Sequence, residues 1–117
     1  MRARFRCLAV LVALGVAAFA ALAHDSERLQ RLITQRYGSE ATARYHDWRE
    51  VIRQAGSAAE ADKLRRVNEF FNRRVRFVED AQVWGRADYW ASPLELLGQG
   101  AGDCEDFAIA KYFSLIE

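Results

Sequence analysis

A single cysteine in a glycine-rich turn carries the clearest chemical signal in this sequence. Cys104 follows Gly98, Gly100 and Gly102 in the stretch GQGAGDCED (residues 98–106), and an apolar helical pattern starts directly behind it. Glycines let the backbone turn sharply into a helix. A thiol in the first turn of that helix lies at the positive end of the helix dipole, which favours the nucleophilic thiolate. We therefore predict that Cys104 is a catalytic nucleophile rather than a buried small apolar residue.

Three carboxylates flank this cysteine: Asp103, Glu105 and Asp106. Negative charge beside a thiol raises its pKa, which opposes activation. The acids can cap and charge the helix N-terminus, or Asp103 and Glu105 can help to bind a hard cation such as Ca²⁺, whose charge offsets theirs. Because Ca²⁺ takes roughly six or more oxygen ligands, spacing alone favours the capping interpretation.

A cysteine nucleophile needs a base, usually a histidine, and a third group that orients it. The sequence holds two histidines, His24 and His46. His24 would be the first residue after the predicted leader, where chains are poorly ordered. His46 falls beside Trp48 in a predicted helix, where we expect it on a half-buried face. Neither position is typical of a catalytic base.

The first residues predict export. Three arginines precede an apolar run from Cys7 to Leu22, and a small-x-small cleavage signal ends at Ala23. The run is shorter than the roughly 20 residues that span a bilayer, so a short membrane anchor is the less favoured interpretation. We assign residues 1–23 to a signal peptide and residues 24–117 to one small domain.

The composition of the remaining domain limits its partners. Three of the 17 basic residues and none of the 16 acidic residues lie in the first 23, so the net charge of the rest is −2. No net positive field remains to attract nucleic acid. The pairs Arg65-Arg66 and Arg73-Arg74 lie among acids and predict the solvent-exposed face of a helix. With Cys7 removed, an internal disulfide is excluded.

Helical patterns dominate the chain that must position Cys104. Apolar spacing predicts one helix that ends at Gly38, a second that Ser39 caps and that ends at Gly56, and a third that begins with a capping box over 57–60. Each helix is predicted to have one apolar face. In the first helix this face consists of Leu29, Leu32, Ile33 and Tyr37, and in the second of Ala41, Tyr45, Trp48, Val51 and Ile52. In the third helix it consists of Leu64, Val67, Phe70 and Phe71.

The second half mixes other elements with helix. Residues 75–78 alternate as an extended segment does, and residues 79–92, with Trp84 and Trp90, are predicted to be an ordered loop. A capping box with proline at the first helical position starts a short helix at Ser92. The final helix, 103–117, is apolar over much of its circumference. Such a helix is normally buried in a larger core, so we expect the chain to be the N-terminal part of a larger domain.

Three segments, WGRADYW (84–90), SPLE (92–95) and GDCEDFAIAKY (102–112), together resemble bacterial transglutaminase-like cysteine peptidases of the LapG type. The resemblance implies an α+β fold, papain/transglutaminase-like, of which this chain holds mainly the helical N-terminal lobe and the nucleophile helix. It assigns the nucleophile to Cys104 and calcium ligation to Asp103 and Glu105. The family's histidine and aspartate follow the cysteine on an antiparallel sheet, which this chain is expected to lack.

The same resemblance implies a function: a periplasmic, calcium-dependent cysteine endopeptidase that cleaves a large surface adhesin and so controls biofilm attachment. It also implies an inner-membrane receptor that senses cyclic di-GMP and sequesters the peptidase. We expect this fragment to be inactive by itself.

Two alternatives remain open. One is a non-catalytic binding module that competes for the receptor or the adhesin, with binding unaffected by Cys104→Ala. The other is a redox or metal-binding protein that uses its lone thiol.

Overall fold

The computed structural model describes residues 25–117, and the predicted signal peptide and His24 lie outside the described residues. The chain divides into two compact units, 1–32 and 33–117. Residues 25–32 of the first unit are helical and carry an exposed pair, in which Arg31 lies 3.5 Å from Glu27. The helix continues to residue 37 and ends at Gly38, whose φ of +88° suits glycine. This end was predicted.

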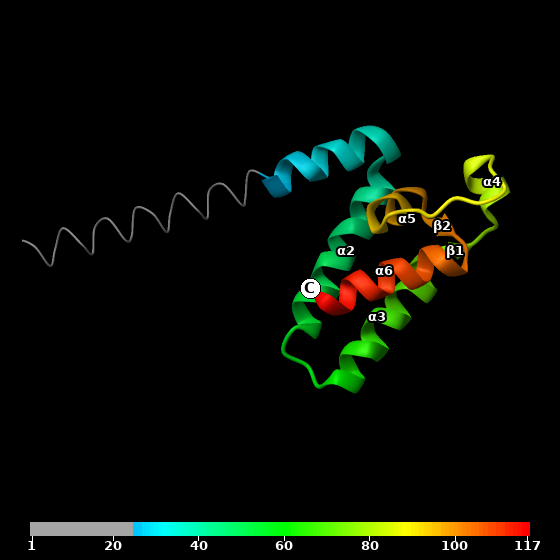
Figure 1. The fold of residues 1–117 in the computed structure, drawn as a ribbon. Helices are drawn as coiled ribbons and strands as arrows, with labels where there is room; N and C mark the ends of the chain where they lie inside the picture. Colours follow the sequence, from blue (N-terminus) through cyan, green and yellow to red (C-terminus); the bar gives the residue numbers. More distant parts are fainter. Residues whose placement is uncertain (1–24) are drawn as a thin grey trace, which may run out of the picture. The chain divides into compact units, whose positions relative to one another are not determined.

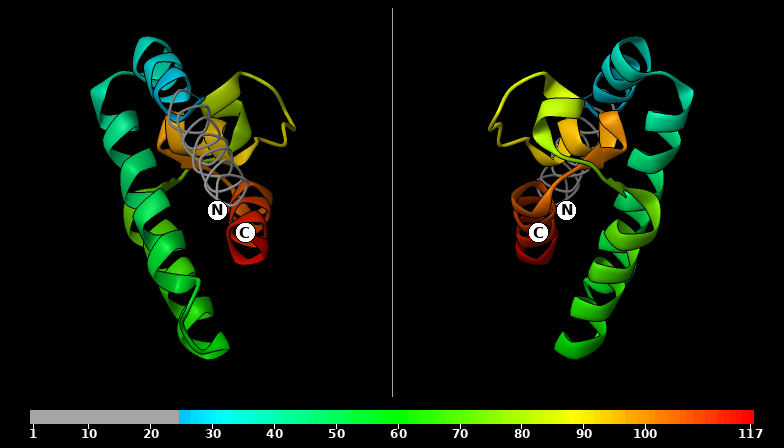
Figure 2. Two further views of the ribbon diagram at one scale, coloured as in Figure 1. Left: turned by 90° about the vertical axis from the view of Figure 1, so that its left-hand side faces the viewer. Right: turned by 90° about the vertical axis from the view of Figure 1, so that its right-hand side faces the viewer.

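Two long helices form a hairpin in the second unit. Helix α2 spans Ser39–Ala55 and α3 spans Glu60–Arg74, joined by a turn that starts at Gly56. Figures 1 and 2 show α2 and α3 side by side. They bury most of the predicted apolar positions: Ala41, Tyr45, Trp48, Val67, Phe70 and Phe71. Leu64 does not follow the prediction, because 48% of its surface is exposed.

Both predicted helix caps at this hairpin are wrong. Gly38, and not Ser39, precedes the first turn of α2, and it brings no side chain to cap it. Before α3 the capping position is Ala59, two residues beyond the expected Ser57, so the predicted capping box does not form within the described chain. Ser57 and Ala58 instead belong to the turn, where the Ala58 N–H donates to the Ala55 carbonyl at 3.1 Å.

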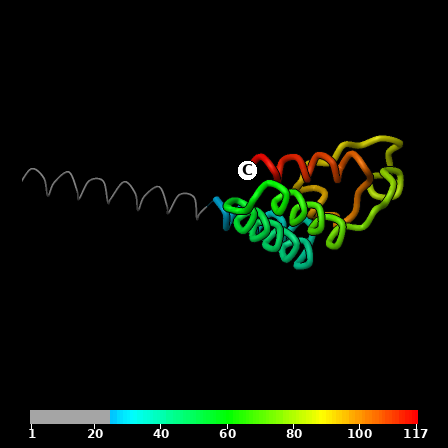
Figure 3. The backbone as a smooth tube through the Cα atoms, turned by 90° about the horizontal axis from the view of Figure 1, so that it is seen from below, coloured from blue at the N-terminus to red at the C-terminus, as the bar shows by residue number. Residues whose placement is uncertain are grey.

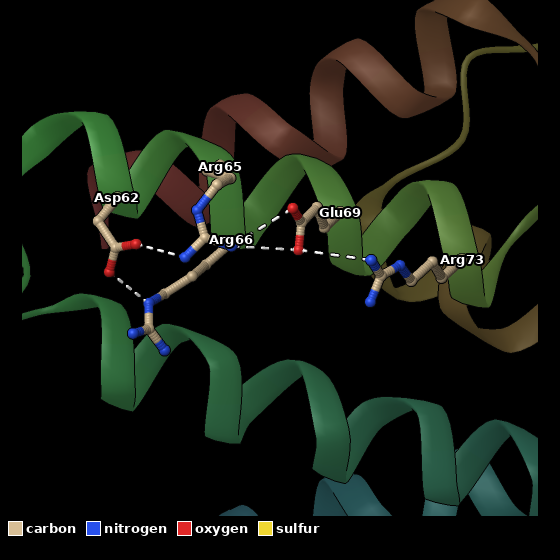
Figure 4. Close-up of polar contacts among 5 residues, drawn as sticks. All are labelled: Asp62, Arg65, Arg66, Glu69 and Arg73. Atoms are coloured by element: carbon tan, nitrogen blue, oxygen red, sulfur yellow. Dashed lines mark hydrogen bonds and ion pairs between the residues drawn. The ribbon is translucent and has the colours of Figure 1, made fainter.

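The face of α3 that carries its arginines is largely exposed, as predicted, and it also forms ion pairs. Asp62 accepts from Arg65 at 2.5 Å and from Arg66 at 2.6 Å, and Glu69 lies 3.3 Å from Arg65 and 3.8 Å from Arg73 (Figure 4). Every arginine in this row therefore has a carboxylate neighbour one helical turn away.

A small parallel sheet leads the chain to Cys104. Strand β1, Arg76–Phe77, pairs with β2, Ala101–Gly102, and the Val78 N–H donates to the Gly102 carbonyl at 2.8 Å. The extended segment was predicted, but its partner strand was not. Two helices lie between these strands along the chain. Helix α4, Asp80–Trp84, forms within the segment predicted to be a loop. Helix α5, Pro93–Gln99, starts with the predicted Ser92–Glu95 capping box.

Helix α6, Cys104–Ile116, lies against α3 and α5, and Figure 3 shows its backbone running beside α3. Its buried side consists of Asp106, Ala110 and Ser114. Ser114 accepts a hydrogen bond of 2.7 Å from the indole N–H of Trp48, which fixes α6 to α2. Much of the predicted apolar face is exposed, since Tyr112 and Ile116 are each 60% exposed.

Candidate active site

Cys104 is the first residue of the 13-residue helix α6, and its side chain is exposed. Strand β2 ends at Gly102, and Asp103 then forms the N-cap of the helix. Gly102 permits a close approach: a Cβ there would lie 2.7 Å from an Asp106 carboxylate oxygen and would also clash with Leu96. The turn therefore places the thiol at the helix N-terminus, where unpaired N–H groups favour a negative charge, as predicted.

Glu105 opposes that effect. The Cys104 thiol donates to the Glu105 carboxylate, with Sγ and Oε2 3.0 Å apart. This bond and the charge of Glu105 raise the pKa of the Cys104 thiol, and Asp103 adds a smaller contribution in the same direction. The thiol is therefore held in its protonated form while Glu105 points at it.

An open hollow of about 530 Å³ adjoins the thiol. Its walls come from α3, β1 and α6, and it is lined by Asn72, Val75, Phe77, Cys104, Phe107, Ala108 and Lys111. Most of the lining is apolar, and the sulfur of Cys104 is accessible from this hollow.

Acidic side chains gather on the other flank of Cys104. Carboxylate oxygens of Asp80, Asp103 and Asp106, all buried, lie within 4.8 Å of one another, and so do those of Asp80, Asp88 and Glu105. Asp80 is common to both groups. The two predicted metal ligands, Asp103 and Glu105, are thus each brought next to Asp80.

Hydrogen bonds satisfy only part of this cluster. Asp80 Oδ2 accepts the Tyr89 N–H at 2.6 Å, and Asp106 accepts the backbone N–H groups of Ala91 at 2.7 Å and Asp103 at 3.3 Å. Asp80 Oδ1 and Asp103 Oδ1 are buried and have no hydrogen-bond partner among residues 25–117. Burial and the neighbouring Glu105, Asp80 and Asp106 carboxylates raise the pKa of Asp103 to about 6.

This donor set suits a hard cation. Buried carboxylates close together cost free energy unless a positive charge compensates them, and carboxylate oxygens are the ligands that Ca²⁺ prefers. Asp103 and Glu105 were named as candidate ligands from the sequence, but Asp80 and Asp88, which the structure brings next to them, were not. Those two come from α4 and the loop after it, at distances along the chain that no local spacing reveals.

Within residues 25–117 the structure brings no histidine to the thiol. His46 lies on α2, exposed rather than half-buried as expected, with its ring 5.9 Å from that of Tyr45. Across the described part of the chain no histidine hydrogen-bonds to Cys104. In the same residues no helix is long and apolar enough to cross a membrane.

Comparisons with known proteins identify the family. The model of the bacterial transglutaminase-like cysteine proteinases matches residues 34–117. A structure of LapG from Legionella pneumophila is 38% identical to this chain, with a TM-score of 0.62, and the match covers 77% of this chain and 49% of LapG. LapG treated with EGTA matches with the same identity and TM-score, over 47% of its length.

The chain therefore spans about half the length of these LapG structures. No curated protein matches it. The predicted fold class is confirmed: the largely helical structure corresponds to the part of the transglutaminase-like fold that carries the nucleophile helix. Family members are peptidases, which act on proteins. The chain belongs to the bacterial transglutaminase-like cysteine proteinases.

Proposed function

We propose that this chain is the nucleophile-bearing part of a periplasmic, calcium-dependent cysteine endopeptidase that cleaves a large surface adhesin. One observation carries the proposal: Cys104 lies exposed at the start of α6, beside a carboxylate cluster in which two buried oxygens have no partner among the described residues. A candidate nucleophile next to a carboxylate cluster that can bind a cation suits a peptidase whose activity depends on a metal.

The chemistry at Cys104 is acyl transfer. The thiolate attacks the scissile carbonyl carbon, and the amine leaves with a proton, which gives an acyl-enzyme that water hydrolyses. The backbone N–H of Cys104 lies in the first turn, where helix N–H groups have no intrahelical acceptor, and it can donate to the oxyanion. The base and the residue that orients it would be the histidine and aspartate that the LapG resemblance places after Cys104.

The acidic cluster can hold Ca²⁺ through Asp103 and Glu105, with Asp80 and Asp88 as further ligands. The bound ion would supply positive charge beside the thiol, which favours the thiolate. Glu105 would connect the ion to the thiol, because its carboxylate accepts a hydrogen bond from the Cys104 thiol in this structure. The Glu105 carboxylate already lies within 4.8 Å of those of Asp80 and Asp88, so an ion held there would compete with the thiol for Glu105, and the pKa of Cys104 would then fall. That one of the matching LapG structures was treated with EGTA, a calcium chelator, supports this assignment.

Substrate, partner and location follow from the resemblance to LapG-type peptidases. We assign a surface adhesin as the substrate and an inner-membrane cyclic-di-GMP receptor as the regulatory partner, which couples cleavage to biofilm attachment. The signal peptide predicted over residues 1–23 supports the periplasm.

Cleavage of a purified adhesin fragment by the intact protein tests this function. We expect cleavage with Ca²⁺, none with EGTA, and none for Cys104→Ala. Leu64→Ala, a change on the exposed side of α3, is the matched control and should cleave normally. Retained cleavage by Cys104→Ala, or cleavage that EGTA does not affect, would refute the corresponding part of the proposal.

A non-catalytic binding module is the second candidate. It is favoured by the absence of any histidine bonded to Cys104 in residues 25–117. The 117-residue chain would then slow cleavage by an intact peptidase, and Cys104→Ala would slow it equally well. A chain that does not compete at concentrations above that of the peptidase removes this candidate.

A further inference from the structure

Two tryptophans of the same short segment, Trp84 and Trp90, have opposite surroundings. Trp84 stacks on Tyr89, with ring centroids 4.4 Å apart, and its indole nitrogen is buried. Trp90 is 68% exposed, and within the described chain it makes no ring contact or hydrogen bond through its side chain. Trp84 therefore packs against its own segment, whereas packing within residues 25–117 does not explain the exposed position of Trp90.

The backbone that presents Trp90 is fixed on both sides. The N–H of Tyr89 is bonded to Asp80 at 2.6 Å, and the N–H of Ala91 is bonded to Asp106 at 2.7 Å. The Tyr89 hydroxyl also donates to Glu95 at 2.7 Å. Ala91 is 1% exposed and Tyr89 is half-buried, whereas the Trp90 side chain between them is exposed.

The same anchors place Trp90 near the nucleophile. Asp106 is in the first turn of α6, two residues after Cys104, and its carboxylate lies within 4.8 Å of those of Asp80 and Asp103. Both backbone bonds around Trp90 therefore end on the carboxylate cluster that flanks Cys104. The backbone at Trp90 is therefore held at the N-terminal end of α6, the end at which Cys104 lies.

An exposed indole held in a fixed position is suited to binding. A large aromatic side chain offers much contact area, and a fixed backbone reduces the entropy lost when a ligand binds. Tryptophan is also the residue type most enriched among those that dominate binding energy. We propose that Trp90 contacts the polypeptide substrate next to the scissile bond and is a specificity-determining residue of the peptidase. This inference rests on the peptidase function proposed above.

The test compares two reagents that alkylate Cys104. Iodoacetamide is small, whereas acetyl-Ala-Ala chloromethyl ketone carries a peptide; in both cases the thiolate displaces a halide and forms a thioether. We expect Trp90→Ala to slow the peptide reagent by about tenfold, as truncation of an interface aromatic does, and to leave the iodoacetamide rate within about twofold. Trp90→Phe should reduce the rate with the peptide reagent by less than Trp90→Ala does. Leu64→Ala is the control and should react with both reagents at the wild-type rates.

A fluorescence measurement on the same adducts reports contact directly. In the wild-type protein the peptide adduct should protect Trp90 from acrylamide quenching, and in Trp90→Phe the adduct should leave quenching of the remaining tryptophans unchanged. Equal peptide-reagent rates for Trp90→Ala and Leu64→Ala, or no protection, overturn the role of Trp90 alone. A wild-type Cys104 that shows no preference for the peptide reagent beyond that of free cysteine overturns the proposed peptidase as well.

Discussion

Replacing Asp103 by asparagine should stabilise the calcium-free protein at neutral pH. Asp103 is 6% exposed, and neighbouring carboxylates help to raise its pKa from 3.8 to about 6. A carboxyl whose folded pKa is raised loses stability as the pH rises from its unfolded pKa through its folded pKa. The folded protein thus bears a cost above about pH 6 that an uncharged amide of the same shape does not.

The magnitude follows from two opposing contributions. A shift from 3.8 to about 6 corresponds to an upper limit of about 3 kcal/mol at neutral pH, because the interacting carboxylates of Asp103 and Glu105 share this cost. Asparagine caps helices as well as aspartate does, but losing the charge at the N-terminus of α6 forfeits about 0.3–1 kcal/mol. The first contribution is the larger one, so Asp103→Asn should raise the unfolding free energy by up to about 2 kcal/mol at pH 7 in EGTA.

Urea unfolding followed by tryptophan fluorescence measures this effect at pH 4 and pH 7. At pH 4 the variant should gain little, because Asp103 is largely protonated in the folded protein. Added Ca²⁺ at 100 times its dissociation constant should stabilise the wild type by about 2.7 kcal/mol and the variant much less. A variant that is less stable than wild type at pH 7 in EGTA would show that Asp103 is a favourable cap and not a strained ligand.

Three further changes test the framework around the site. Gly102→Ala should lower the unfolding free energy by about 1–3 kcal/mol in urea, because its Cβ meets the buried Asp106 carboxylate; an unchanged midpoint would mean that the turn can relax. Ser114→Ala should cost about 1–3 kcal/mol, because the indole N–H of Trp48 loses its buried acceptor, and a neutral result in the same titration would indicate that water replaces the hydroxyl. Arg65→Ala should leave the thermal midpoint almost unchanged at high salt, because Arg65 is exposed and its two carboxylate partners are only half-buried; a large loss would show that the α3 network acts cooperatively.

The sequence predicted correctly some features that depend on residues close together along the chain. The helix end at Gly38 and the Ser92–Glu95 capping box depend on residues within one turn of each other, and both were confirmed. The box predicted over 57–60 met the same local rule but failed, because the turn after α2 uses Ser57 before α3 begins. A capping pattern is therefore informative only when the preceding element ends where expected.

Contacts between segments that are distant along the chain could not be predicted from the sequence. Asp80 reaches Asp103 across 23 positions, and β2 pairs with β1 across 25, from Arg76 to Ala101. Nothing in the residue pattern specifies which acid meets which. The position of Cys104 at the start of a helix was predicted because a glycine turn and a helix start are local features. The composition of the carboxylate cluster, and the difference between Trp84 and Trp90, depend on how the loop between α4 and α5 folds onto α6.

The hydrogen bond between Trp48 and Ser114 has a consequence for the order of folding. It joins residues 66 positions apart, whereas α2 and α3 are neighbours that a short turn connects. Contacts between distant residues carry a larger loop-closure entropy and form more slowly than local ones. The helical hairpin should therefore form early and α6 dock late, so Asp80 meets Asp103 and Asp106 beside Cys104 only after the rest of the unit has assembled.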